Sequence, residues 1–363
     1  MHYRTLISSC LTLALVACQG SSSSQNLDGD PIKIGYIGPL TGDFASAGAD
    51  TLNPVLMRAA EINAKGGIDG RPIKVIAENG HCTASEAASA AQKLVNVDKV
   101  VAIIGGQCSS ETLAAAPIAE AGSVVMISPV SSSPDVTDAG TYIFRNYPSD
   151  ALKTKAMARY LEKRGYQKIA MITENTDFNY AFRTGLTAHV GADNVVFNEL
   201  VEPGTKDYRS LVTRLKDTDF DLFFPNAQTD STMAAMVQQL REQGLTQPMI
   251  AHDVGDSLTL AELAGTSIEN MYVINVPTSG EGGLFEQRYT KEYGDAQVAM
   301  GFVAHAYDAA GIVLEAIAEV GTDGAAIRDY LHRHPGYQGI VGNFRFDRNG
   351  DVIGIPYVLK QFQ

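Results

Sequence analysis

Two hydroxyl side chains, Ser109 and Ser110, stand shortly after an apolar run that ends in Gly105-Gly106. The run predicts a buried strand, and the serines then stand at the start of the next helix. Backbone N–H groups at a helix start lack intrahelical partners, and the helix dipole adds positive potential there. This pattern favours binding of a carboxylate, although serines at such positions also serve as plain turn or cap residues.

The loops after two further predicted strands also carry polar groups. Hydroxyls and backbone amides gather around Ser131 and Ser132, after the apolar run 124–127. Asp253 follows the apolar run 249–251, and its carboxylate suits an ammonium group; the alternative is a solvated loop or cap aspartate. Because open α/β sheets bind ligands at the carboxyl ends of their strands, these side chains predict one small-molecule site.

Motifs for catalysis are missing from the sequence. It contains no Gly-x-Ser-x-Gly, phosphate-loop or His-Glu-x-x-His pattern, and no Gly-x-Gly-x-x-Gly after a strand. The acidic turn at 347–351 has the wrong spacing for an EF-hand loop and is predicted to be a plain hairpin turn. We therefore predict no catalytic residue, no cofactor and no metal, with an enzyme whose site is assembled from distant residues as an alternative.

The charge balance limits the choice of partners. The chain has 28 Lys and Arg residues against 41 Asp and Glu residues, a formal net charge of −13. Such a surface repels nucleic-acid phosphates and anionic lipid headgroups, so no nucleic-acid partner is expected.

The four cysteines separate by position. Cys10 and Cys18 lie in the N-terminal segment, which leaves Cys82 and Cys108 in the folded part. In an oxidising compartment two remaining cysteines most simply form one disulfide. A metal site that includes the adjacent His81 is the alternative, but two thiols and one histidine make a poor zinc set.

The N-terminal segment has the features of an export signal. A charged start precedes a short apolar run that ends in Leu15-Val16-Ala17-Cys18, and serines follow. The quartet resembles the bacterial lipobox, which implies a signal peptide at 1–17, a lipidated Cys18 and a flexible tether at 18–30. The alternative is an ordinary secretory signal with an incidental cysteine. Both interpretations take the chain out of the cytoplasm.

From residue 31 onward, apolar strands alternate with helical patterns. Strands are predicted at 32–37, 73–77, 100–104 and 124–127, and again at 169–172, 195–197, 222–224 and 249–251. This alternation predicts an α/β protein with parallel sheets and helices on both faces, and the length predicts two lobes. The first helix is predicted to start at Asn53-Pro54. A C-terminal hairpin is predicted, with strands at 344–346 and 357–359. The apolar helix near 302–320 is assigned to packing.

Several stretches resemble the leucine/isoleucine/valine-binding proteins of ABC transporters. They include the segment 60–70, with its Asn-Ala-Lys-Gly-Gly sequence, and the segments 105–110, 126–129 and 307–309. The resemblance runs from about Pro31 to the C-terminus and implies two doubly wound lobes that are joined by three crossovers and close on an amino acid. One lobe is expected to comprise 31–149 and 277–334, and the other 150–276 and 335–363. The family disulfide matches the cysteine pair.

The resemblance also assigns roles to residues. Ser109 and Ser132 are similar to the groups that bind the ligand carboxylate, and the carbonyl of Val130 and the carboxylate of Asp253 to the partners of its ammonium group. Phe178 stands where the family has a tyrosine that contacts the ligand, and the stretch that ends in Thr229 replaces another aromatic residue. The expected ligand-binding set is Ser109, Val130, Ser131, Ser132, Phe178, Thr229 and Asp253. The two departures put a large aliphatic ligand side chain in doubt.

The expected function is capture of an amino acid or similar small polar ligand for an ABC importer. The resemblance implies an ABC permease as partner, a periplasmic or cell-envelope location, and contact with a membrane through the lipid anchor only. A ligand-sensing module of the same fold is the alternative from another class.

Overall fold

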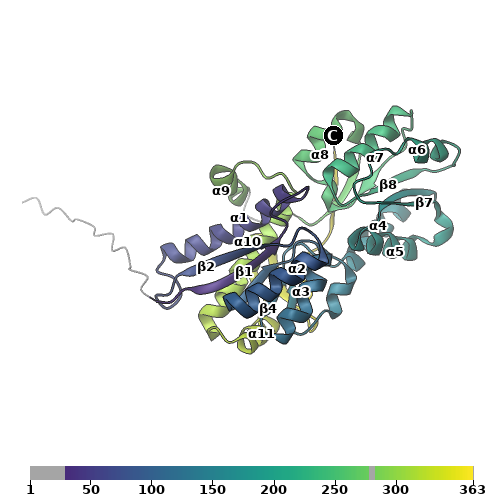
Figure 1. Cartoon of the computed structure of the whole chain (residues 1–363). Coiled ribbons are helices and arrows are strands. Elements are labelled where there is room, and N and C mark those ends of the chain that lie inside the picture. Colours follow the sequence, from purple (N-terminus) through teal and green to yellow (C-terminus); the bar gives the residue numbers. More distant parts are fainter. Residues whose placement is uncertain (1–28, 278–282, 363) are drawn as a thin grey trace, which may run out of the picture.

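The structure is a computed structural model that describes residues 29–277 and 283–362. Two lobes lie side by side, and the chain crosses between them (Figure 1). The predicted signal peptide, most of the tether and Cys18 lie outside the described residues, so the lipidation of Cys18 stays a prediction.

The first lobe is built on a parallel sheet with the strand order β2-β1-β3-β4-β5. The strands are β1 (Ile32–Gly38), β2 (Ile73–Asn79), β3 (Ala102–Gly105), β4 (Val125–Ser128) and β5 (Ile143–Arg145). The four strands predicted before residue 130 are confirmed. The inner strands β1, β3 and β4 are almost entirely buried, as expected where helices cover both faces, whereas the edge strand β2 is largely half-buried or exposed.

Helices cover both faces of this sheet, because strand side chains alternate between the faces. Tyr36 points into a core made with one set of helices, and Ile37 into a core made with the other. The first set is α1 (Ala45–Ala64), α9 (Leu284–Tyr293), α10 (Met300–Val320) and α11 (Gly324–Arg333). The second set is α2 (Ala84–Gln92), which continues into η1 (Lys93–Asp98), and α3 (Ser109–Ala121). The short η2 (Pro134–Asp138) follows β4.

The second lobe repeats the architecture. Its strands are β6 (Ile169–Glu174), β7 (Val195–Val201), β8 (Leu222–Asn226), β9 (Ile250–Ala251), β10 (Tyr272–Asn275) and β14 (Val358–Gln361). The strand orders are β7-β6-β8 and β9-β10-β14. A bridge between Phe223 and Met249 connects these two groups of strands. Among them, only β14 runs antiparallel to its neighbour. The four strands predicted between residues 169 and 251 are confirmed.

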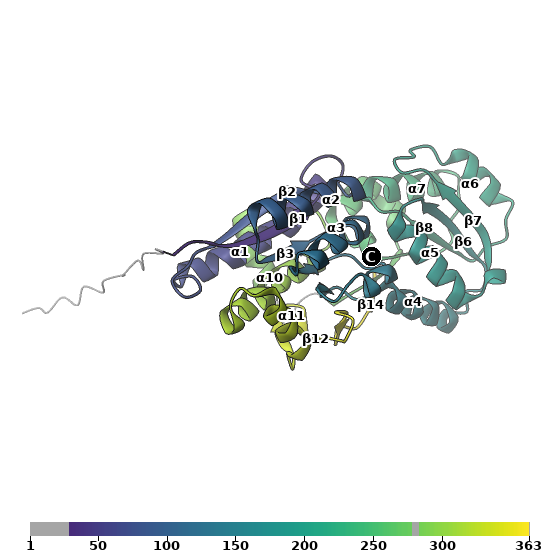
Figure 2. The same cartoon turned by 60° about the horizontal axis from the view of Figure 1, so that its bottom comes forward.

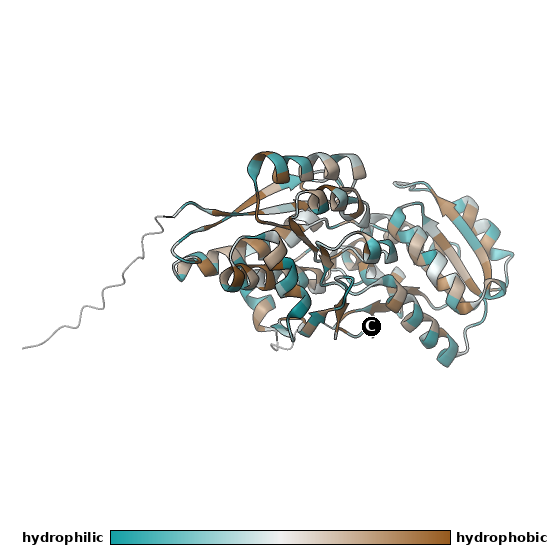
Figure 3. Cartoon of the chain, turned by 90° about the horizontal axis from the view of Figure 1, so that it is seen from below, coloured by the Kyte–Doolittle hydropathy of each residue, from teal (hydrophilic) through white to brown (hydrophobic). Residues whose placement is uncertain are grey.

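Two helical layers flank this second sheet. One is α4 (Asp150–Arg164) with α5 (Asp177–Val190), and the other is α6 (Arg209–Lys216), α7 (Asp230–Glu242) and α8 (Leu258–Ala264). Short turns of helix complete the lobe, namely η3 (Ala192–Asn194), η4 (Asp253–Gly255) and η5 (Gly265–Ile268). Figure 3 shows mainly brown strands between helices that also carry teal residues, the pattern of a sheet buried on both faces.

The chain crosses between the lobes three times, after β5, after β10 and before β14 (Figure 2). Two doubly wound lobes with three crossovers are the predicted fold. The predicted boundary at residue 335 is wrong, however. Tyr337, Phe344 and Val352 belong to the core of the first lobe, so the last crossover lies just before β14.

The C-terminal hairpin differs from its prediction. Strands β11 (Tyr337–Gly339), β12 (Gly342–Phe346) and β13 (Val352–Ile353) form a small antiparallel sheet, and the partner of 344–346 is β13 rather than 357–359. The turn is tight because Gly350 has φ +79° and donates its N–H to the carbonyl of Asp347. Arg145 on β5 binds the carboxylate of Asp351 with 2.6 Å between Nε and Oδ1, which fixes the turn to the first lobe.

The first helix also differs from its prediction, because α1 starts at Ala45 and contains Pro54 in its interior. The expected start at Asn53-Pro54 is wrong. The early turns are held by tertiary bonds: the Tyr36 hydroxyl donates to the carbonyl of Gly48 at 2.9 Å and lies 2.7 Å from the hydroxyl of Thr51. Packing against β1 therefore outweighs the helix-breaking tendency of proline.

One described helix, α10, is long and apolar enough to cross a membrane by length and composition alone. It is 89% buried within the first lobe, so its apolar character comes from core packing, as predicted.

Candidate functional site

A cavity of about 200 Å³ lies between the lobes, and it opens toward a wider space of about 1280 Å³. Six of the seven predicted ligand-binding residues line it: Ser109, Val130, Ser132, Phe178, Thr229 and Asp253. The first three come from the first lobe and the others from the second lobe. The structure thus brings these six residues together between the lobes, and their binding of a ligand stays a prediction.

Ser109 is the first residue of α3, as predicted. The loop before it is closed by Glu111, whose buried carboxylate accepts N–H bonds at 2.9 Å from Gln107, Cys108 and Cys82. The Ser109 hydroxyl oxygen accepts the N–H of Ser133 at 3.2 Å, so its own proton is free to be donated. A hydroxyl donor at a helix N-terminus is the arrangement expected for a carboxylate site.

Ser131 is the one residue of the predicted ligand-binding set that does not line the cavity. Its hydroxyl lies 2.7 Å from the hydroxyl of Thr112 and bonds to the carbonyls of Gly106 and Gln107 at 3.1 and 3.2 Å. These bonds draw the side chain into the first lobe. Ser131 therefore shapes the loop, which is the cap or turn role considered from the sequence.

Ser132 lines the cavity, but its hydroxyl is already engaged. It donates to Oδ2 of Asp150 at 2.9 Å, and its carbonyl accepts the backbone N–H of Asp150 at 2.8 Å. A serine hydroxyl has one proton, so in this conformation Ser132 presents lone pairs to the cavity. Donation to a ligand carboxylate then falls to Ser109 and to the start of α3.

Asp253 is buried, and its two carboxylate oxygens differ in their surroundings. Oδ2 accepts a bond from the ammonium group of Lys153 at 2.6 Å and another from the hydroxyl of Tyr147. Oδ1 has no hydrogen-bond partner among the described residues. Its neighbour at 3.4 Å is Nδ1 of His252, which accepts the N–H of Val254. One buried oxygen of a cavity-lining carboxylate is therefore left without a donor.

The charge on Asp253 follows from these contacts. Burial is the largest single influence and raises the pKa of its carboxyl group, but the contacts with Lys153 and His252 together lower that pKa by more, so the net pKa lies below the usual range of aspartate. Asp253 is consequently ionised at neutral pH. A charged buried carboxylate with a free lone pair is suited to an ammonium group.

Phe178 and Thr229 close the cavity from the second lobe. The ring of Phe178 lies edge-on to that of His252, with 5.0 Å between ring centroids. Thr229 caps α7, and its hydroxyl accepts the N–H of Thr232 at 3.1 Å. Phe178 therefore offers apolar surface, while Thr229 has its hydroxyl partly committed to the helix start.

The cavity lining is negatively charged. Among the described residues, the carboxylates of Asp43, Asp230 and Asp253 line it, and no Lys, Arg or His does. Burial raises the pKa of Asp230 to about 6, and a bond from the Ser257 hydroxyl counteracts only part of this effect. This lining favours a ligand that carries positive charge and disfavours a simple carboxylate.

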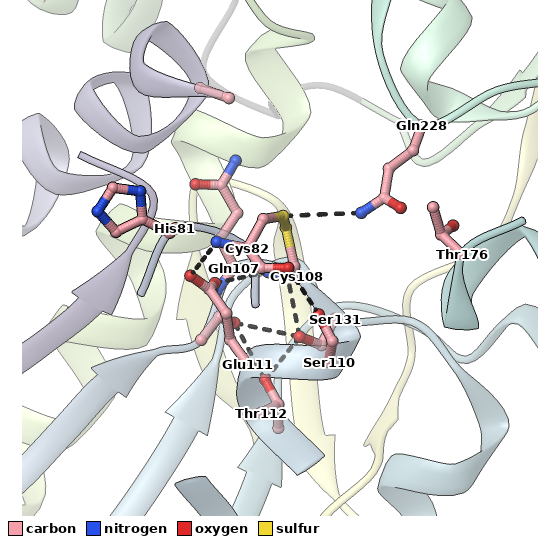
Figure 4. The surroundings of a disulfide bond; sticks show 12 residues. His81, Cys82, Gln107, Cys108, Ser110, Glu111, Thr112, Ser131, Thr176 and Gln228 are labelled. Carbon is pink, nitrogen blue, oxygen red and sulfur yellow. Dashed lines mark hydrogen bonds between the residues drawn. A yellow bond between two sulfur atoms is a disulfide. The ribbon is translucent and has the colours of Figure 1, made fainter. Parts of the chain in front are cut away.

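The predicted disulfide between Cys82 and Cys108 is present, with 5.3 Å between the Cα atoms. Figure 4 shows that Gln228 reaches toward it from the second lobe, and its amide nitrogen lies 3.7 Å from the sulfur of Cys82. The metal alternative is wrong, because both thiols are consumed and His81 contacts Thr41 and Asn79 instead. No group of three or more potential metal ligands exists within residues 29–277 and 283–362.

A buried histidine next to the site makes stability depend on pH. His305 on α10 packs its ring 4.8 Å from that of Tyr147, and neither ring nitrogen has a hydrogen-bond partner among the described residues. Burial lowers its pKa to about 3. Since the unfolded chain binds the proton near pH 6.5, the stability that neutral His305 provides is lost as pH falls from there toward 3.

We therefore expect His305→Leu to remove part of the acid sensitivity. Between pH 7 and 4.5 the wild type should lose about 2–3 kcal/mol of unfolding free energy relative to this variant. Urea unfolding of both proteins at the two pH values measures the difference. If the difference in unfolding free energy between the two proteins is the same at both pH values, His305 is not the source of the acid sensitivity.

Sequence reasoning missed the residues that hold Asp253, namely Tyr147, Asp150 and Lys153. The one available signal was the i, i+3 spacing of Asp150 and Lys153, which puts both on one helix face. A lysine in the first turns of a helix is normally exposed, and nothing in the sequence shows that a second carboxylate faces it.

Comparisons with known proteins agree with this architecture. The family model described as "Periplasmic binding protein" matches residues 31–360. The chain is 27% identical to a leucine-specific-binding protein of Salmonella typhimurium over 99% of its own length and 96% of the relative's. It is 30% identical to a Leu/Ile/Val/Thr-binding protein of the same organism, with 75% and 73% covered.

A solved structure shows the same likeness. It is the substrate-binding protein of a branched-chain amino acid transporter from Streptococcus pneumoniae, in complex with isoleucine. The TM-score is 0.81 at 26% identity, with 91% of this chain and 100% of that chain covered.

Proposed function

This chain belongs to the periplasmic binding protein family, and we propose that it captures a small α-amino acid for an ABC importer. Members of the family are solute-binding proteins, and this chain is accordingly a binding protein rather than an enzyme. The names of its relatives, which bind leucine, isoleucine, valine or threonine, support an amino acid as ligand.

The observation that carries the proposal is the unused oxygen of Asp253. This oxygen is buried at the wall of the cavity, belongs to an ionised carboxylate, and lacks a donor. A ligand ammonium group supplies both the missing hydrogen bond and a compensating charge. The carbonyl of Val130, on the opposite lobe, is the proposed second partner of that ammonium.

The proposed place of the ligand carboxylate is the start of α3. There the Ser109 hydroxyl has a proton to donate, and the helix dipole favours negative charge. Asp253, the charged partner of the ammonium group, and the carboxylate site therefore lie on different lobes. A zwitterion that contacts both would stabilise the approach of the lobes, which is the closure this fold performs.

The proposed side chain is short or polar rather than large and aliphatic. The volume of about 200 Å³ is smaller than that of typical drug-sized ligand sites, about 300–1,000 Å³. Gln228, Thr229 and Ser231 line the second-lobe wall, and Phe178 supplies an apolar surface beside them. A polar wall of this kind leaves donors and acceptors unpaired when a branched alkyl chain fills the space.

Two measurements test the proposal. Mass spectrometry of small molecules released from natively purified protein identifies a retained ligand. Calorimetric titration with the twenty L-amino acids, and with the matching carboxylic acids that lack the amine, then ranks affinities. We expect at least one amino acid with a short or polar side chain to bind, and its deaminated analogue not to. A best ligand without an amine would contradict the proposed pocket chemistry.

Delivery to an ABC permease is the second half of the proposal. It rests on the family and on the name of the Streptococcus pneumoniae protein, which belongs to an amino acid transporter. A periplasmic location follows from the family as well. The finer proposal is a lipoprotein, in which Cys18 carries the acyl chains and the serine-rich segment gives the lobes reach.

The anchor is tested by Cys18→Ser. Two or three acyl chains hold a protein stably at a membrane, whereas a chain without them has an acidic surface that lipid headgroups repel. We expect the wild type to sediment with membranes and the variant to stay in the soluble fraction. Cys10→Ser, in the same segment, is the matched control and should leave sedimentation unchanged. A Cys18→Ser protein that still sediments with membranes would rule out the anchor.

A further inference from the structure

An unusual ion cluster lies beside the cavity. Lys153 on α4 is fully buried, and its ammonium nitrogen lies 2.8 Å from Oδ1 of Asp150 and 2.6 Å from Oδ2 of Asp253. Lysine is almost never buried to this degree unless it is paired. Four aromatic rings surround the ammonium group at 5.5–5.7 Å, those of Tyr147, Phe178, Phe182 and Tyr357.

The cluster is incomplete as it stands. Two carboxylates flank one ammonium group, so one negative charge is in excess in a buried place. Oδ1 of Asp253 is the oxygen without a donor, whereas Oδ2 has two. Asp253 lines the cavity and Lys153 does not. The lysine therefore supports Asp253 from outside the cavity, and the missing positive charge has to come from the cavity itself.

We infer that Lys153 is a positioning residue for the ligand's ammonium group: it holds Asp253 charged, occupies Oδ2, and leaves Oδ1 to the ligand. This inference rests on the proposed function. It adds to the proposed function that the ligand brings one positive charge to the Asp253 end of the cavity, and this charge makes the ion cluster neutral. The inference also predicts that Asp253 itself stays ionised, with Oδ1 available to the ammonium group, in mildly acidic medium.

The groups around Asp253, together with the cavity-lining Asp230, determine how the pocket responds to pH. They are Tyr147 and Tyr357 from the crossovers, Asp150 and Lys153 from α4, His252 beside Asp253, and His305 from α10. Burial raises the pKa of both tyrosines, so they stay neutral. Burial lowers the pKa of Lys153, but Asp150 and Asp253 together raise that pKa by more than burial lowers it, so the lysine stays charged.

Removing the lysine charge should shift the pKa of the Asp253 carboxyl group upward instead of downward. Burial continues to raise the pKa of the carboxyl group, and the largest influence that lowers it is gone. The ligand-free variant then holds a protonated Asp253, which must release its proton before an ammonium group can bind. Affinity should fall as pH falls, by up to about tenfold per pH unit.

The test uses Lys153→Gln, because glutamine keeps a hydrogen-bond donor of similar length without the charge. Lys153→Arg keeps the charge. Lys155→Gln, on the exposed side of the same helix, is the matched control. If Lys153→Gln does not fold, the double variant Lys153→Gln with Asp150→Asn replaces it, since that pair of changes retains the single excess negative charge.

Two measurements are made on each protein. Carbon-13 NMR follows the carboxyl titration of Asp253 without ligand, with the signal assigned from an Asp253→Asn sample. Calorimetry between pH 5 and pH 8 follows binding of the L-amino acid that binds the wild type most tightly, in two buffers of different ionisation enthalpy. The buffers reveal protons that are released on binding.

We expect Asp253 to remain ionised down to pH 5 in the wild type and the Lys155→Gln control, so that Kd in these two proteins changes with pH only through Asp230, whose pKa is about 6. In Lys153→Gln, the Asp253 carboxyl group should titrate above pH 5, and the Kd should weaken at least about tenfold more from pH 8 to pH 5 than it does in the control, with additional proton release. Lys153→Arg should restore the wild-type profile.

An unchanged carboxyl titration in the lysine variant overturns the inference, whatever the ligand data show. A Kd profile of Lys153→Gln that matches that of the Lys155→Gln control, with no additional proton release, overturns it too. Failure of the proposed function looks different: the wild type then binds no amino acid at any pH, while the NMR titration still decides the role of Lys153.

Discussion

Replacing Asp253 by alanine should weaken amino-acid binding by at least about a hundredfold, which corresponds to about 2.7 kcal/mol. A charge-assisted hydrogen bond in a buried site contributes about 1.5–3 kcal/mol, and a ligand ammonium left without its partner adds to the loss. The protein itself should remain folded, because Lys153 keeps its ion pair with Asp150 at 2.8 Å. Calorimetric titration of both proteins with the same amino acid measures the effect.

Two further variants make this result specific. Asp253→Asn keeps the shape of the side chain and removes its charge, so it should lose nearly as much affinity as alanine. Asp219→Asn removes a carboxylate that is 84% exposed on the surface of the second lobe, and it should bind as the wild type does. If Asp253→Ala binds an amino acid as tightly as the wild type, the ammonium site lies elsewhere.

The alternation of strands and helices was predictable because each element is indicated by the residues of its own segment. The strands β1 and β6 read as continuous apolar runs, since helices cover both sheet faces and no position needs to be polar for solvent. The start of α1 was not predictable in this way. Asn53-Pro54 is a good local start signal, yet contacts of Tyr36 with Gly48 extend the helix toward Ala45.

The C-terminal segment shows a second limit. The turn at 347–351 was recognised, but the strand after it was assigned to 357–359 rather than to β13. Both stretches are short and apolar, so local pattern cannot decide between them. The decision comes from tertiary contacts, because β14 pairs with β10 in the other lobe and Arg145 fixes Asp351 to the first lobe.

In the candidate site, the residues predicted from strand ends lie together in the structure. Ser109, Ser132 and Asp253 were named for this reason, and all three line the cavity, while their roles in binding stay predictions. The burial of Lys153 was not predicted, and it stands beside Leu152, which is 51% exposed. Asp150 in the same helix turn and Asp253, one hundred residues away in the chain, both pair with the lysine ammonium group, and together they make the burial of its charge favourable.

Loss of the disulfide is the second change for which we expect a large effect. Cys82 and Cys108 are separated by 26 residues, and closing such a loop restricts the unfolded chain. In the chain-entropy model this contributes about 3.5 kcal/mol of stability. The double variant Cys82→Ala with Cys108→Ala should lose roughly that amount in urea unfolding at neutral pH, with the transition of the first lobe shifted to lower urea.

The same variant should also bind ligand more weakly, because the disulfide holds a wall of the site. Cys108 lines the cavity directly before Ser109, and Gln228 of the other lobe contacts the sulfur of Cys82 (Figure 4). Wild-type protein unfolded in the presence of a reductant is the matched control, and its urea midpoint should fall to that of the double variant. A loss of less than about 1 kcal/mol would mean that Glu111, which binds three backbone N–H groups of both cysteine loops, already fixes them without the covalent bond.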